Sequence, residues 1–94
     1  MATFYSGTSV RYNENGGAIY TEIAAACHEF EEVADLFKLL AKEGKYQAGD
    51  GLQIFENQYA EEKEGERLKI STVFVGEATL VRPGMLRFCY GTHG

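Results

Sequence analysis

A single amphipathic helical pattern, residues 28–44, limits what this chain can fold into. Its apolar side chains recur at intervals of three and four positions and form one stripe. The stripe consists of Phe30, Val33, Leu36, Phe37 and Leu40, with Ala34 and Ala41 beside it. Glutamates fill the first turn and lysines lie toward the end, an order that suits the helix dipole. Gly44 is the expected C-terminal stop.

The segment before this helix has the pattern of a β-hairpin. Residues 3–12 alternate between two sets of side chains, one of which contains Phe4 and Val10, as in a strand with one buried side. Residues 13–17, Asn-Glu-Asn-Gly-Gly, tolerate the positive φ angles of a hairpin turn. We therefore expect residues 18–26 to form the returning strand.

The segment after the helix predicts further strands joined by short turns. In order, we expect a strand at 52–62, a turn at 63–66, a strand at 67–76 and a last strand at 78–91 that Pro83 and Gly84 interrupt. Alternation places Leu52 and Ile54 on the inner side of the first of these strands. The inner side of the next strand is predicted to consist of Leu68, Ile70, Thr72 and Phe74.

These elements define the predicted fold class. Short turns make neighbouring strands antiparallel, and one amphipathic helix can cover only one face of their sheet. We therefore predict a single α+β domain over residues 1–94, with an antiparallel sheet of four or five strands, one helix on one face and the order ββαβββ. The other face is left to meet water or a partner.

The charge balance argues against nucleic acid and membrane as direct partners. The 94 residues contain 14 Asp and Glu against 9 Lys and Arg, a net charge of -5. No cluster of Lys and Arg is available to bind phosphates. The sequence also lacks a basic, apolar leader and an apolar stretch long enough to span a membrane. We therefore expect a cytoplasmic protein.

The two cysteines and two histidines raise the question of a metal site. Cys27 with His28 and Cys89 with His93 could form a Cys2His2 set if the fold brought them together. Neighbouring side chains in a strand point to opposite faces, however, so Cys27 and His28 make an awkward ligand pair. The alternative is that both cysteines are small, partly buried apolar residues. We expect no metal and no cofactor.

Catalysis is not indicated by any motif. A Cys27 nucleophile near a helix start would be opposed by the glutamates of the first turn, because negative charge disfavours a thiolate. An acid–base pair could be drawn from Glu14, Glu22, Asp50 and Glu56, but any acidic chain offers such a set. We therefore expect a protein that is not an enzyme.

Acidic and aromatic side chains are the strongest indication of function. Glutamates crowd the second hairpin, and strand alternation places Tyr5, Phe55, Tyr59, Val73 and Val75 opposite the predicted core. Exposed aromatic residues are typical of interfaces. The partner-binding residues predicted from this pattern are Tyr5, Phe55, Glu56, Tyr59, Glu61, Glu62, Glu64 and Glu66. The alternatives are that the charges are simply solvated, that the rings pack within the monomer, or that this face forms a homodimer.

The sequence thus favours a small acidic protein-binding module, an inhibitor or adaptor that occupies a surface of a larger partner. A basic groove that normally receives nucleic acid would be such a surface. Phage-encoded inhibitors of bacterial defence, including anti-CRISPR proteins, are often of this type, an analogy of size, charge and missing motifs only. Two alternatives stay open: a homo-oligomeric structural or assembly protein, and a small-ligand-binding protein or enzyme that uses the open sheet face.

Overall fold

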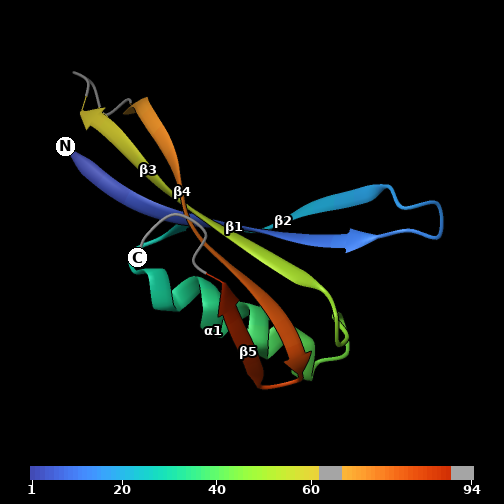
Figure 1. The fold of residues 1–94 in the computed structure, drawn as a ribbon. Coiled ribbons are helices and arrows are strands. Elements are labelled where there is room, and N and C mark those ends of the chain that lie inside the picture. The colour runs from blue at the N-terminus through green and yellow to red at the C-terminus, as the bar shows by residue number, and fades with distance from the viewer. Residues whose placement is uncertain (62–66, 90–94) are drawn as a thin grey trace.

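The computed structural model describes residues 1–61 and 67–89, except for the side chains of Glu61 and Arg67. This part of the chain forms β1 (Ala2–Tyr12), β2 (Ala18–Cys27), α1 (Phe30–Lys42), β3 (Gly51–Glu61), β4 (Arg67–Arg82) and β5 (Met85–Cys89). The strands make one antiparallel sheet in the order β2-β1-β3-β4-β5, with α1 on one face (Figure 1). The predicted fold class and element order are confirmed.

Both ends of α1 follow from local chemistry. The Glu32 carboxylate accepts the backbone N–H groups of His28 and Glu29, each at 2.9 Å, so a first-turn glutamate caps the helix start. At the other end Gly44 has a φ of 90°, and its N–H donates to the Ala41 carbonyl at 3.0 Å. This left-handed glycine ends the helix as predicted.

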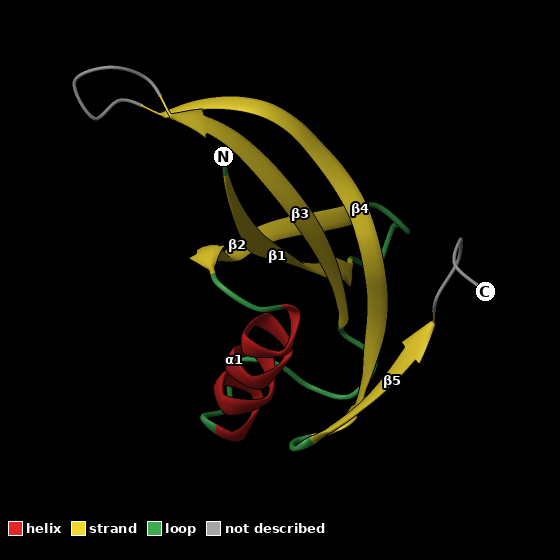
Figure 2. Cartoon of the chain, turned by 90° about the vertical axis from the view of Figure 1, so that its left-hand side faces the viewer, coloured by secondary structure: helices red, strands yellow, loops and turns green. Residues whose placement is uncertain are grey.

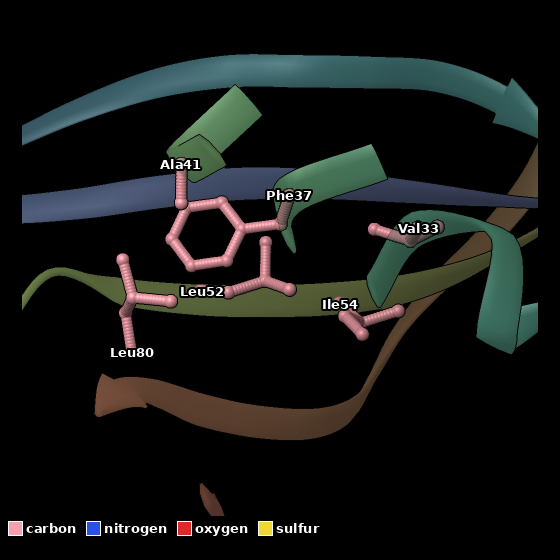
Figure 3. Packing of buried hydrophobic residues seen from close by; sticks show 6 residues of the cluster. All are labelled: Val33, Phe37, Ala41, Leu52, Ile54 and Leu80. Carbon is pink, nitrogen blue, oxygen red and sulfur yellow. The ribbon is translucent and has the colours of Figure 1, made fainter. Parts of the chain in front are cut away.

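The core lies between α1 and the middle of the sheet (Figure 3). It is formed by Val33, Phe37 and Ala41 of α1, Leu52 and Ile54 of β3, and Leu80 of β4. The predicted stripe residues Val33 and Phe37, with Ala41 beside them, are therefore confirmed as core. Leu52 and Ile54 on the inner side of β3 are confirmed as well.

Gly7 on β1 lets the helix approach the sheet. A Cβ atom built at this position would overlap Cγ1 of Val33 and come within 3.3 Å of Cγ1 of Ile23. Val33 is 0% exposed, so the space beside Gly7 is already filled.

The last strands differ from the prediction in where they break. β4 runs without interruption to Arg82, and Pro83 and Gly84 form the turn into β5. The break expected after Gly76 is wrong, because glycine at this position leaves room for the Phe30 ring, 3.0 Å from a built Cβ. A glycine in a strand can thus mark a close approach instead of an end.

Two bulges in the β3–β4 pairing change which β4 side chains face the helix. The pairing shifts between Ile54 and Phe55, so that Val75 packs against the core while Phe74 pairs with Phe55 on the other face. Each bulge adds one residue to β4 and reverses the alternation beyond it. The predicted inner side of this strand is therefore wrong for Thr72 and Phe74. Leu68, beyond the second bulge, returns to the helix side.

The sheet extends beyond the helix at two places. One is the end of the β1–β2 hairpin, residues 11–22, which we call the arm; the other comprises residues 56–61 and 67–73, which we call the distal section. The arm extends to one side of the body and the ends of β3 and β4 to another (Figure 1), giving extents of 46 × 28 × 25 Å. Among the described residues, no helix is long and apolar enough to cross a membrane.

Candidate interaction surface

The predicted partner-binding residues do not share one face. Residues directly opposite in an antiparallel pair point to the same side of the sheet. Tyr5 pairs with Glu56, and Tyr5 also meets the Phe30 ring of α1 edge-to-face at 6.5 Å. Both residues therefore lie on the helix side, while Phe55 and Tyr59, at odd separations from Glu56 along the same strand, lie on the outer side. The prediction of one open face holding Tyr5, Phe55 and Tyr59 is wrong.

The other four predicted glutamates lie at the end of β3 or between β3 and β4, where their side chains are not described. The side chain of Glu61 and the whole of Glu62, Glu64 and Glu66 lie outside the described residues. Their backbone neighbours, Glu61 in β3 and Arg67 in β4, are paired strand residues.

The outer side carries two groups of packed aromatic rings. Phe55 meets Phe74 edge-to-face with ring centroids 5.8 Å apart. Phe4 contacts the Tyr59 ring at 5.8 Å and the His28 ring at 5.5 Å. Phe4 is 9% exposed, because its neighbours shelter it without any covering helix. Packing along the sheet thus shelters part of the apolar surface that the sequence left open.

A buried amide lies between Phe55 and Tyr59 on the same side of β3. Asn57 is 2% exposed, and its side-chain nitrogen donates to the Phe4 carbonyl at 3.3 Å and to the Ser6 hydroxyl at 3.1 Å. Its side-chain oxygen accepts the Thr72 hydroxyl at 2.8 Å. The network joins β1, β3 and β4, so it stabilises the sheet where α1 does not reach.

The helix side of the distal section exposes an apolar strip. Leu68, Ile70 and Val73 of β4, the distal strip, are 57%, 54% and 50% exposed. Val73 lies opposite Glu56, Leu68 lies opposite Ala60, and Ile70 lies at the bulge between them. The strands arch over the helix here and continue past it (Figure 2). Three large apolar side chains within residues 68–73 of one strand, each half exposed, are a surface expected of a binding site.

Element lengths explain why the distal strip is exposed. At about 1.5 Å a residue, the 13 residues of α1 span about 20 Å. At about 3.3 Å a residue, the 16 residues of β4 span about 53 Å. One helix cannot cover such a strand. The element lengths carry this signal in the sequence, whereas strand alternation alone predicts Leu68 and Ile70 in the core.

Acidic groups lie on the same side as the distal strip. The Glu56 carboxylate accepts the side-chain N–H of Gln58 at 3.1 Å. Glu56 is opposite Tyr5, which contacts the first residue of α1, so it lies one strand from the helix start where Glu29 and Glu31 are exposed. Of the acidic hairpin predicted from the sequence, the structure thus describes the Glu56 side chain, which lies on the helix side of the sheet.

The cysteines lie far from one another. Cys27 ends β2 and Cys89 ends β5, so β1, β3 and β4 separate them. Burial raises the pKa of the Cys27 thiol, and the Glu32 carboxylate adds to this rise, which disfavours the thiolate. Within residues 1–61 and 67–89, no three His, Cys, Asp or Glu side chains gather as metal ligands; His93 lies outside these ranges.

The Asp50 carboxylate forms an ion pair with the Arg11 guanidinium. This carboxylate accepts two bonds from the Arg11 guanidinium, one of them 2.9 Å from Nε, and one from the backbone N–H of Gln47 at 2.9 Å. The hydrogen bond from Arg11 holds the pKa of Asp50 below its usual value. Asp50 therefore fastens the loop before β3 to β1.

No protein-family model, curated protein sequence or solved structure matches this chain. Its function is therefore inferred from its own surfaces.

Proposed function

We propose that this chain is a protein-binding module that holds a larger partner against the distal strip. The observation that carries the proposal is the exposure of Leu68, Ile70 and Val73, each at half or more, on strands that continue past the helix. Apolar side chains gathered at the centre of a contact supply most of the binding energy in protein interfaces. The partner is expected to present an apolar patch of similar width.

Charge supports a basic rim on that partner. The chain carries a net charge of -5, and Glu56 and the helix start lie on the same side as the distal strip. Glu61 ends β3, and Glu62, Glu64 and Glu66 lie between β3 and β4 in the sequence. Complementary charge steers association and selects the partner. A surface that normally receives nucleic acid has this combination of basic and apolar groups, so inhibition of such a protein is the form we propose.

We also propose that this chain is cytoplasmic. Cys27 and Cys89 are free thiols in the described part of the structure. Free thiols persist in a reducing compartment.

Affinity capture with matched variants tests the proposal. The tagged chain is incubated with native lysate, bound proteins are identified by mass spectrometry, and the affinity of the recovered partner is then measured with purified components. Leu68→Ser with Val73→Ser is expected to weaken binding by about 1–2 kcal/mol, roughly 5- to 30-fold. The control is Leu39→Ser with Met85→Ser, which removes side chains 52% and 44% exposed elsewhere on the surface.

Three outcomes decide the matter. Failure to recover a stoichiometric partner, or equal weakening by the two variants, would reject the distal strip as the binding surface. Reversal of Glu61, Glu62 and Glu64 to Lys is expected to weaken binding and to reduce its dependence on salt. Affinity unchanged by this reversal at both low and high salt would remove the basic rim and the nucleic-acid-groove version.

A further inference from the structure

β2 is an edge strand with an open side. It pairs with β1 and, among the described residues, with no other strand. Its ten residues, Ala18–Cys27, contain one charged side chain, Glu22, and neither lysine nor proline. Charges and prolines are the usual protection of an exposed edge. The edge of β2 is therefore available for pairing with another strand.

The regular part of this edge is short and well defined. The β1–β2 pairing shifts on either side of Gly7, whose partner is Ala24. From Glu22 back to Ala18 the pairing is continuous. A bulge twists a strand and disrupts a ladder, so five residues, 18–22, can pair with a straight partner.

The hairpin turn shows which backbone groups point outward. The Asn13 N–H donates to the Gly17 carbonyl at 2.8 Å, so these residues close the hairpin as a hydrogen-bonded pair. Bonded and non-bonded pairs alternate along an antiparallel ladder. Ile19 and Thr21 therefore direct their N–H and C=O groups toward β1. Ala18, Tyr20 and Glu22 direct theirs to the open edge.

The arm that carries this edge is held in place. The Arg11 guanidinium, opposite Ile19, binds the Asp50 carboxylate, whose side chain is 5% exposed. The Asn13 side-chain oxygen accepts the N–H groups of Asn15 and Gly17 at 2.9 and 2.8 Å and stiffens the turn. A fixed strand loses less conformational freedom when it pairs, which favours association.

We propose that two copies of this chain pair through β2, antiparallel and centred on Tyr20, and so form a continuous ten-stranded sheet. In this register Ala18 of each copy lies opposite Glu22 of the other, and all outward N–H and C=O groups of 18–22 find a partner. The two Glu22 side chains lie at opposite ends of the ladder, so like charges do not meet. A second copy is favoured over a foreign strand because this single register satisfies both edges at once.

The side chains agree with this register. Tyr20 is 59% exposed and would lie opposite its counterpart, while Tyr12, 68% exposed on the neighbouring strand, flanks the same pair. Ile19, 51% exposed, would lie opposite Thr21 on the helix side. Aromatic pairs and pairs of β-branched residues are the favourable cross-strand combinations. Exposed apolar groups of both sides of the arm would thus be covered in the dimer.

Sedimentation equilibrium tests the dimer and its register together. The wild-type chain is expected to show a monomer–dimer equilibrium between micromolar and millimolar concentration, because a small interface gives weak association. Ala18→Glu places a glutamate opposite each Glu22 and is expected to weaken dimerisation roughly 2- to 30-fold, since two like-charge pairs form in each dimer. Ala18→Glu combined with Glu22→Lys converts these into ion pairs and is expected to restore it.

Ala25→Glu is the matched control, because it makes the same charge change on the same strand outside the five-residue ladder. It is expected to leave dimerisation unchanged, and far-UV circular dichroism with thermal unfolding confirms that each variant folds.

A chain that stays monomeric at millimolar concentration overturns the proposal. Equal weakening by Ala18→Glu and Ala25→Glu, or a double variant that is no tighter than Ala18→Glu, also overturns it. Dimerisation lost only with Leu68→Ser and Val73→Ser would assign self-association to the distal strip instead. This dimer is independent of the proposed partner binding.

Discussion

Gly7→Ala is expected to destabilise the protein, although its backbone conformation is open to alanine. A glycine replaced by alanine at a compatible position stabilises a protein by about 0.4–1 kcal/mol, because the unfolded chain loses freedom. At Gly7 the added Cβ would overlap Cγ1 of Val33, a side chain that is 0% exposed. Overpacking of a filled core costs about 1–3 kcal/mol. Because this cost exceeds the gain from the unfolded chain, we expect a net loss of about 1–2 kcal/mol.

A double-mutant cycle isolates the contact. Val33→Ala alone removes two buried methyl groups and is expected to cost about 2–3 kcal/mol. It also removes the Cγ1 atom that Gly7→Ala would strike, so the double variant is expected to cost less than the sum of the two by about 1 kcal/mol or more. The free energies of unfolding come from urea denaturation. A loss of 1 kcal/mol corresponds to about 4–8 °C in the thermal midpoint of a domain of this size.

Gly51→Ala provides the control. A Cβ atom built there has Val10 Cβ as its nearest neighbour at 3.6 Å, an ordinary contact. This variant is expected to be neutral or slightly stabilising. If Gly7→Ala were as stable as the wild type, or if its loss simply added to that of Val33→Ala, the close approach of α1 to β1 would be wrong.

Three further outcomes follow from single sites. Asn57→Ala is expected to lower the free energy of unfolding in urea by about 1–3 kcal/mol, because buried partners lose their hydrogen bonds; an unchanged midpoint would refute the buried network. The Arg11 pairing lowers the pKa of Asp50 in the folded state, so its stabilisation is present above the unfolded pKa of about 4 and is lost as the pH falls through the folded value. Thermal unfolding at pH 7 and below pH 4 is expected to show Arg11→Met less stable at pH 7, with a smaller loss on acidification; equal losses in both proteins would contradict this. Cys89 is exposed, whereas Cys27 is partly buried with a raised pKa, so a thiol reagent should label Cys89 first in a time course followed by peptide mass spectrometry, and equal rates would refute the placement of Cys27.

Sequence patterns that act within a few residues are sufficient to predict the helix and the strands. The helical stripe from Phe30 to Ala41, the first-turn glutamates and Gly44 each act over a few residues, and the helix lies at Phe30–Lys42. The Asn-Gly turn of the first hairpin is likewise a local feature, with Gly16 at a φ of 84°. The strand order in the chain and the antiparallel class follow from turn lengths, which are also local.

The faces of the distal strands could not be predicted in the same way. A bulge moves every later side chain of a strand to the other side, and nothing in the local pattern marks the two in β4. For that reason Val75 packs against the core, whereas Phe74 lies on the outer side. Likewise, Tyr5 lies on the helix side because Phe30 packs there, a contact between segments 25 positions apart.

The sequence by itself determined the helix, its caps, the first hairpin and the order of the strands, because each depends on dihedral preferences and hydrogen bonds within a few residues. Only the tertiary structure decided the exposure of the distal strip, the separation of Cys27 from Cys89 and the open edge of β2. These depend on where a helix of about 20 Å lies on strands of about 53 Å and on which strands end at the edges of the sheet. The physical reason is that burial is a property of the assembled layers, whereas the pattern of a segment records only its own preferences.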